Sequence, residues 1–220
     1  GQGAVKEELE SRSSYMRQVI KDRNKFGPML EDLIEQIAAF RPRDMRQLEA
    51  FVAEVERRLA RLSDERMVLK HEQFSAWPER RLDLMREAVA KEKELLGLIQ
   101  AADVSGASWD PPANRRQRFA YVEGKLQWLA SHLDSLIRDK DELKKRFDRD
   151  QVPFDWPLFD KLKHSPVVFA KYTMTLALED GSAEMVEEGV RLAFKCHQVA
   201  GGFDGECNDL FAQLSAFLEA

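Results

Sequence analysis

The positions of the prolines constrain this chain more than any other sequence feature. Each proline is expected to begin or end a helix, because proline cannot donate the backbone hydrogen bond that a helix interior requires. The eight prolines lie at positions 28, 42, 78, 111, 112, 153, 157 and 166. Between them apolar residues recur at helical spacing, and no stretch alternates like a strand. The sequence predicts an all-α fold with helices near 4–25, 28–40, 44–71, 78–102, 112–150, 166–179, 182–200 and 204–219.

Two of the predicted helices carry a heptad repeat of apolar residues. In the helix at 44–71 the repeat consists of Leu48, Val52, Val55, Leu59, Leu62, Arg66 and Leu69. In the helix at 112–150 it consists of Phe119, Val122, Leu126, Leu129, Leu133, Leu136, Lys140, Leu143 and Phe147. Each seam contains one cation, which fixes register or marks where the seam meets water or a partner. Both seams can pack inside one bundle, or part of one can pair with a second copy of the chain.

The segment 101–111 is the best candidate for an internal boundary, because its residues are small and polar and two prolines follow. We expect a single all-helical domain over 1–220. Within it, extended N-terminal helices at 1–102 would be followed by a long helix and a compact C-terminal bundle at 112–220. No apolar run reaches the roughly 20 residues of a membrane span. Two cysteines cannot make a disulfide framework, which favours a reducing compartment.

The residues that could carry chemistry do not form a recognisable motif. Cys196, His197 and Cys207 lack the paired spacing of a metal site. No serine or cysteine lies in a nucleophile motif, and Gly201 and Gly202 resemble a helix C-cap rather than a phosphate loop. We therefore expect no enzyme activity, no metal and no cofactor. The net charge of −5 and the lack of a binding motif also argue against nucleic acid as a partner.

Charge is distributed unevenly along the chain. Residues 115–149 contain ten Lys or Arg against six Asp or Glu, whereas residues 179–220 contain two against nine. A long helix with basic ends suits docking on an acidic protein surface or antiparallel self-association. A solvated helix face that binds nothing remains the alternative. If an acidic protein is the partner, we expect it to contact the cationic residues Arg115, Arg116, Arg118, Lys140, Lys144, Lys145 and Arg149.

Five strings, in order along the chain, carry a family resemblance. They are ESRS at 10–13, LSDERMVLKH at 62–71, WPE at 77–79 with LMREA at 84–88, VPFDW at 152–156, and GVRLAFKCHQVAGGFD at 189–204. Together they resemble the C-terminal domain of the plant chloroplast unusual positioning protein family, which includes the increased petal growth anisotropy proteins. The resemblance covers about residues 7 to 215.

This resemblance implies a cytoskeletal module with an elongated multi-helix fold. The best-known family member couples the chloroplast outer envelope to short actin filaments for light-dependent movement, and its C-terminal domain resembles the formin homology domain. The resemblance therefore implies an actin-binding domain that promotes filament nucleation and polymerisation. Its partners would be actin, profilin-bound actin and a second copy of the chain, and the seven cationic residues would contact actin.

The resemblance also implies a location and an alternative function. The domain would be cytoplasmic, held at the chloroplast envelope by N-terminal regions that this sequence lacks, with no membrane contact of its own. Petal-growth relatives are tied to microtubules, however. A microtubule-associated or adaptor scaffold located on microtubules is therefore the second hypothesis.

Overall fold

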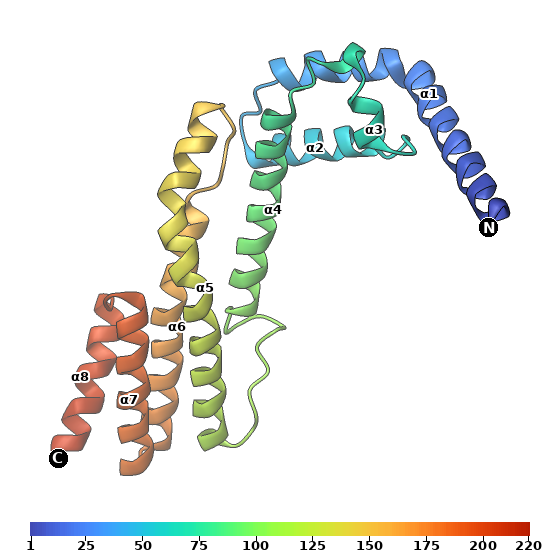
Figure 1. Ribbon diagram of the computed structural model, residues 1–220. Helices are drawn as coiled ribbons and strands as arrows, with labels where there is room; N and C mark the ends of the chain where they lie inside the picture. Colours follow the sequence, from blue (N-terminus) through green and yellow to red (C-terminus); the bar gives the residue numbers. More distant parts are fainter. The chain divides into compact units, whose positions relative to one another are not determined.

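The computed structural model describes residues 1–220 and contains helices and connections only (Figure 1). The predicted all-helical class is confirmed. No helix is both long enough and apolar enough to cross a bilayer. The elements are α1 (Gln2–Ala39), α2 (Met45–Leu59), α3 (Glu65–Leu69), the 3₁₀ helix η1 (Glu72–Phe74), α4 (Glu79–Ala101), α5 (Arg115–Arg149), α6 (Pro157–Asp180), α7 (Ala183–Ala200) and α8 (Gly205–Glu219).

The chain forms two compact units. The first consists of residues 1–90 and 145–154, and the second of residues 91–144 and 155–220. In the first unit the second half of α1 packs against α2, α3 and η1. Its core is apolar and consists of Val19, Leu30, Leu33, Ile37, Val55, Leu59, Leu62, Val68, Phe74 and Leu82.

A buried carboxylate fixes α1 to the connection between α2 and α3. Asp22 is only 5% exposed, and it accepts hydrogen bonds from the backbone N–H of Ser63 (2.7 Å) and from the Ser63 hydroxyl (2.5 Å). The amide of Gln18 donates a third bond to it. These bonds lower the pKa of Asp22, because they stabilise the ionised form.

The prediction of one helix over 44–71 is wrong. The chain forms α2 and the short α3, with a break at residues 60–64. Asp64 begins the separate helix α3, because its carboxylate accepts a hydrogen bond from the Met67 N–H (3.0 Å) as an N-cap. The preceding residue, Ser63, binds Asp22. Serine and aspartate side chains compete in this way with helix hydrogen bonding. Leu48, Val52, Val55, Leu59 and Leu62 are buried as the heptad predicts, but not on one rod.

Two prolines lie inside helices, contrary to the prediction. Pro28 is within α1, so the helices expected at 4–25 and 28–40 are one. Pro166 is within α6, which starts at Pro157 and not at 166. An internal proline removes a hydrogen bond and bends the helix, and α1 changes direction near its middle (Figure 1). Burial of neighbouring apolar side chains such as Leu30 and Phe169, both 0% exposed, offsets this cost.

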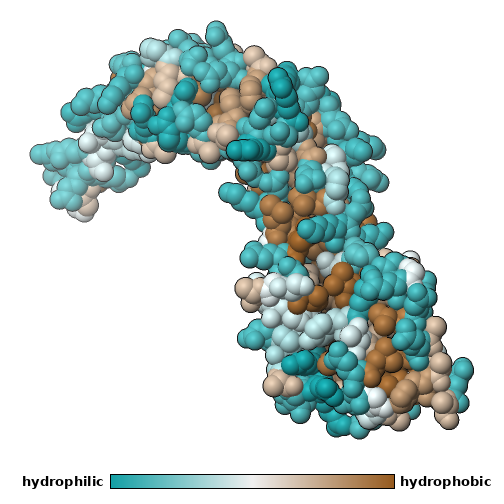
Figure 2. Space-filling view, turned by 180° about the vertical axis from the view of Figure 1, so that it is seen from behind, coloured by the Kyte–Doolittle hydropathy of each residue, from teal (hydrophilic) through white to brown (hydrophobic).

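The second unit contains a bundle in which α6, α7 and α8 pack against one another. Gly181 (φ 75°) ends α6 and Gly201 (φ 79°) ends α7, both in the left-handed region that favours glycine. Asp204 caps α8 by accepting from the N–H of Cys207 at 2.9 Å. The predicted role of Gly201 as a helix C-cap is confirmed. Apolar residues gather on part of the surface of this bundle, coloured brown in Figure 2.

Close contact between α6 and α7 depends on a glycine. A Cβ atom at Gly189 would lie 2.6 Å from the Cβ of Ala177 and 3.8 Å from the ring of Phe119. Gly189→Ala is therefore expected to lower the free energy of unfolding by about 1–3 kcal/mol, because the helices must separate. Gly124→Ala is the matched control, since that glycine lies in α5 with nothing near its Cβ position. The control should gain up to about 1 kcal/mol. Equal melting temperatures for the two variants would contradict the packing described.

Candidate partner-binding surface

All seven cationic residues predicted to bind a partner lie on α5, but they form two groups at opposite ends of this 35-residue helix. Arg115, Arg116 and Arg118 lie in its first turn. Lys140, Lys144, Lys145 and Arg149 lie in its last three turns. The structure therefore does not bring the seven residues together into one cluster, and each group has its own surroundings.

The N-terminal group is largely neutralised within the second unit. Arg115 pairs with Asp180 at the end of α6, with 3.1 Å between guanidinium and carboxylate, and Arg116 pairs with Glu184 in the first turn of α7. The Ser182 hydroxyl and then Arg115 lower the pKa of Asp180. These two cations already have counter-ions, so they contribute little net field for an acidic partner.

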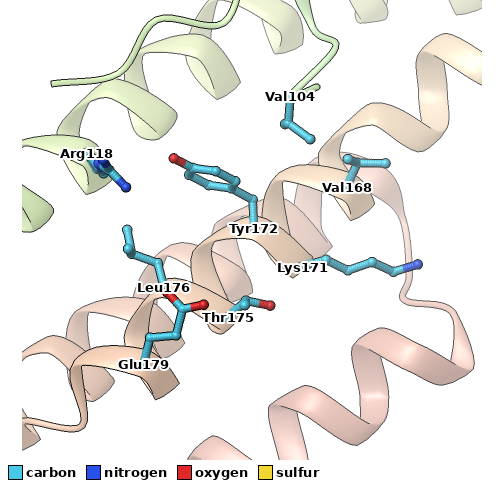
Figure 3. Close-up of a pocket in the computed structure, with 8 residues that line it drawn as sticks. All are labelled: Val104, Arg118, Val168, Lys171, Tyr172, Thr175, Leu176 and Glu179. Atoms are coloured by element: carbon cyan, nitrogen blue, oxygen red, sulfur yellow. The ribbon is translucent and has the colours of Figure 1, made fainter. Parts of the chain in front are cut away.

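Arg118 lines an open groove of about 280 Å³ in the second unit (Figure 3). Its guanidinium donates to the carbonyl of Pro112 at 2.8 Å, which fixes the chain that enters α5. One stripe of α6 forms most of the groove, and Tyr172 reaches towards Arg118 in Figure 3. The other lining residues are Val104, Val168, Lys171, Thr175, Leu176 and Glu179.

The C-terminal group differs because, of its four cations, only Arg149 takes part in an ion pair. Lys144 and Lys145 are exposed and take part in no hydrogen bond or ion pair. Lys140 lies over the ring of Phe159, 5.5 Å from the centroid, and Arg149 is 3.7 Å from the carboxylate of Asp150. We call Lys144, Lys145 and Arg149 the α5 basic end. Lys145 and Arg149 are four residues apart, so they lie on the same face of the helix.

A groove of about 440 Å³ in the first unit lies beside Arg149, between the first turns of α4 and the end of α5. On one wall Arg146 makes a bidentate pair with Glu87, with both distances 2.7 Å. Arg80 and Arg146 also line this groove, although neither was predicted to bind a partner. The run KKRFDR at 144–149 was the available signal for Arg146. Nothing in the sequence pointed to Arg80, because it lies on another helix.

No group of three or more His, Cys, Asp or Glu side chains is arranged to hold a metal ion. Cys196 and Cys207 are both buried. Burial raises the pKa of Cys196 to about 12 and that of Cys207 to about 11, so both thiols are protonated at neutral pH.

A carboxylate on α5 is the centre of an ion-pair network with α7. Glu123 pairs with Arg191 at 2.9 Å and with Lys195 at 2.5 Å, and Arg191 also pairs with Glu188. Hydrogen bonds from Arg191 and Lys195 lower the pKa of Glu123 from 4.5 to about 2. This network joins the middle of α5 to α7 within the second unit.

The network predicts a pH effect on stability. The folded-state pKa of Glu123 is depressed, so its contribution is complete above pH 4.5 and is lost as the pH falls towards about 2. The wild-type melting temperature should therefore fall more steeply over this range than that of Glu123→Gln, which has no charge to lose. Thermal unfolding at several pH values measures both slopes. Parallel curves for the two proteins would show that the pairing does not stabilise the fold.

Comparison with known proteins defines the class of the domain. Residues 85–219 match the family model described as "IPGAL1-like, C-terminal domain", where IPGAL1 is increased petal growth anisotropy 1. The chain belongs to this family. It is also 29% identical over 226 residues to the curated protein "Uncharacterized protein At4g04980" of Arabidopsis thaliana. That alignment covers 94% of this chain but 30% of the relative, so the chain spans less than a third of the relative's length. The predicted likeness to the petal-growth proteins is confirmed.

Proposed function

We propose that this chain is a non-catalytic domain that binds actin and promotes filament assembly through the α5 basic end. The observation that carries the proposal is that Lys144 and Lys145 are exposed and without counter-ions at the end of a long helix. Such unpaired cations steer association with an acidic surface and add complementarity once it is bound. An actin filament offers a repeating acidic surface of this kind.

The pattern of ion pairs supports the C-terminal end of α5 as the end that binds. A partner at the N-terminal end would compete with Asp180 and Glu184, which already neutralise Arg115 and Arg116. At the C-terminal end no carboxylate must be displaced from Lys144 or Lys145. The proposed contact residues are therefore Lys144, Lys145 and Arg149. The other three cations, Arg115, Arg116 and Arg118, would instead stabilise the second unit.

Microtubules are the second candidate, and the family match favours them. The matched model is named after increased petal growth anisotropy 1, and the sequence resemblance ties petal-growth relatives to microtubules. Because microtubules are also acidic polymers, the same cations would serve. In this case the domain acts as a microtubule-bound adaptor and does not assemble actin.

Profilin-bound actin would supply the subunits for assembly. Regions of a longer protein would hold the domain in the cytoplasm at the chloroplast envelope, or on microtubules if those are the partner. Such regions are consistent with the relative, which is more than three times as long as the aligned part. The domain itself would not contact the membrane.

Sedimentation with each filament tests the proposal. The chain should pellet with actin filaments, less so as salt is raised, and should shorten the lag of assembly in a fluorescent actin assay. Pelleting with microtubules and not with actin would replace the first candidate by the second. A chain that stays in the supernatant with both filaments at low salt would overturn the proposal.

A further inference from the structure

The groove beside Arg118 in the second unit contains two polar groups that the chain itself does not satisfy (Figure 3). The Arg118 guanidinium donates its Nε–H to the carbonyl of Pro112, but it takes part in no ion pair. Arg115 and Arg116, in the same turn of α5, do have counter-ions. The Tyr172 hydroxyl reaches towards Arg118 and takes part in no hydrogen bond. A guanidinium and a phenol are therefore free to donate to a ligand in this groove.

The other part of the groove lining is apolar. Leu176 lines it and is only 6% exposed, and the half-buried side chains of Val104 and Val168 line it as well. The volume of about 280 Å³ is smaller than the roughly 300–1,000 Å³ of pockets that hold small molecules. A groove of this size suits a few side chains of a peptide better than a cofactor.

The groove is open and follows one stripe of α6. Its lining residues on this helix recur at spacings of three and four residues from Val168 to Glu179. These two residues are about 16 Å apart along the helix, at 1.5 Å per residue. A linear peptide can lie along such a stripe and continue past both of its ends. The shape therefore favours a side chain within a segment over the terminus of a chain.

Contacts within the second unit hold the lining side chains in place. The ring of Trp109 packs edge-on against that of Tyr172, with 5.4 Å between the centroids. Lys171 is held by the carboxylates of Asp204 at 2.7 Å and Glu206 at 3.0 Å. Because these side chains are already ordered, a ligand that binds beside them loses less affinity to conformational entropy.

The charges of the groove favour a ligand with a single carboxylate. Lys171 is neutralised by its own partners, so Arg118 is the lining cation without a counter-ion. The terminal nitrogens of a guanidinium can bind a carboxylate through two parallel hydrogen bonds. Glu179 lines the same groove, is exposed and takes part in no ion pair. Its charge disfavours a ligand that carries several acidic groups.

We propose that this groove binds a linear segment of a partner protein in which one Glu or Asp lies close to an aliphatic residue. The carboxylate accepts hydrogen bonds from the Arg118 guanidinium and the Tyr172 hydroxyl. The aliphatic side chain packs against Leu176 and Val168. The inference does not depend on filament binding, which is proposed for the other end of α5.

NMR titration of the whole chain with synthetic peptides tests the inference. Each peptide contains one glutamate and one leucine, one to four positions apart, between glycines and serines, with both ends blocked. At least one spacing should shift the amide resonances of residues 168–179. Replacing the glutamate of that peptide by glutamine should weaken binding by about 10-fold, because a charge-assisted pair is lost. Replacing its leucine by serine should weaken binding by about 5-fold.

Three results of the titration would overturn the inference. One is the absence of shifts for every spacing at millimolar peptide. Another is equal binding by a peptide of three glutamates without leucine, which would indicate a general anion site. The third is binding only by glutamine peptides whose C-terminus is left free, which would indicate that the groove holds a chain terminus.

Two variants test the contact residues. Tyr172→Phe should weaken the best peptide by about 3-fold or more and leave the melting temperature unchanged, because the hydroxyl has no partner in the free chain. Arg118→Gln should weaken it by about 10-fold or more and remove the preference for glutamate over glutamine. Arg138→Gln is the matched control, since Arg138 is a 74% exposed arginine on α5 that does not line the groove.

Tyr172→Phe is the decisive variant, because Arg118→Gln also removes the hydrogen bond to Pro112. Wild-type affinity in Tyr172→Phe, or an equal loss of affinity in Arg118→Gln and Arg138→Gln, would contradict the proposed contacts. Sedimentation with filaments does not depend on any of these results, so the two proposals fail separately.

Discussion

Replacing Arg81 by alanine is expected to lower the free energy of unfolding of the first unit by about 3 kcal/mol. The Arg81 guanidinium donates to the carbonyls of Ile37 (2.8 Å) and Phe40 (2.7 Å) at the end of α1, and to the carbonyl of Asp150. One side chain on α4 thus connects three segments that are distant in the sequence. Its removal leaves helix-terminal carbonyls without donors, and burial makes such unpaired groups costly.

Arg81 is partly buried, and this desolvation, followed by the charge of Arg41, lowers its pKa. A lysine cannot reproduce three divergent bonds, so Arg81→Lys should recover only part of the loss. Arg80→Ala provides the control, because Arg80 is 65% exposed and its nearest carboxylate is Asp150 at 3.9 Å. Chemical denaturation followed by circular dichroism measures all three variants. If Arg81→Ala were no less stable than Arg80→Ala, these hydrogen bonds would not hold α1, α4 and residue 150 together.

Reversing the charges of Lys144 and Lys145 together is expected to weaken filament binding by about 10-fold or more, because each change replaces an attraction by a repulsion. The effect should diminish as salt is raised. The melting temperature should not change much, since both side chains are exposed and unpaired. Quantitative sedimentation across a range of filament concentrations measures the affinity.

A matched variant separates a local effect from net charge. Lys161 and Lys163 on α6 are also exposed lysines without ion pairs, so Lys161→Glu with Lys163→Glu changes the net charge by the same amount. We expect this variant to bind nearly as well as wild type. Equal loss of binding in the two double variants would mean that overall charge, and not the α5 basic end, determines the affinity.

The fold was most predictable where a local signal marks the start or the end of a helix. The bounds of α4, α5, α7 and α8 agree with the sequence prediction to within a few residues, since Pro78, Ser182, Gly201 and Asp204 act locally. The errors arise from tertiary contacts. Residues 60–64 break a helix because Ser63 binds Asp22, which is 41 residues away. Burial of their neighbours lets Pro28 and Pro166 remain inside helices.

The candidate site was less predictable than the fold. Counting charges located the cations on α5, but it could not reveal that Asp180 and Glu184, more than 60 residues away, neutralise Arg115 and Arg116. Nor could it place Arg80 beside Arg149.

Lysine footprinting on the filament-bound chain tests the central claim most directly. An acetylating reagent and mass spectrometry report which lysines become protected when filaments are added. If the α5 basic end is the contact surface, Lys144 and Lys145 should lose reactivity while Lys161 and Lys163 remain reactive. Full reactivity of Lys144 and Lys145 in chain that has pelleted with filaments would contradict the account.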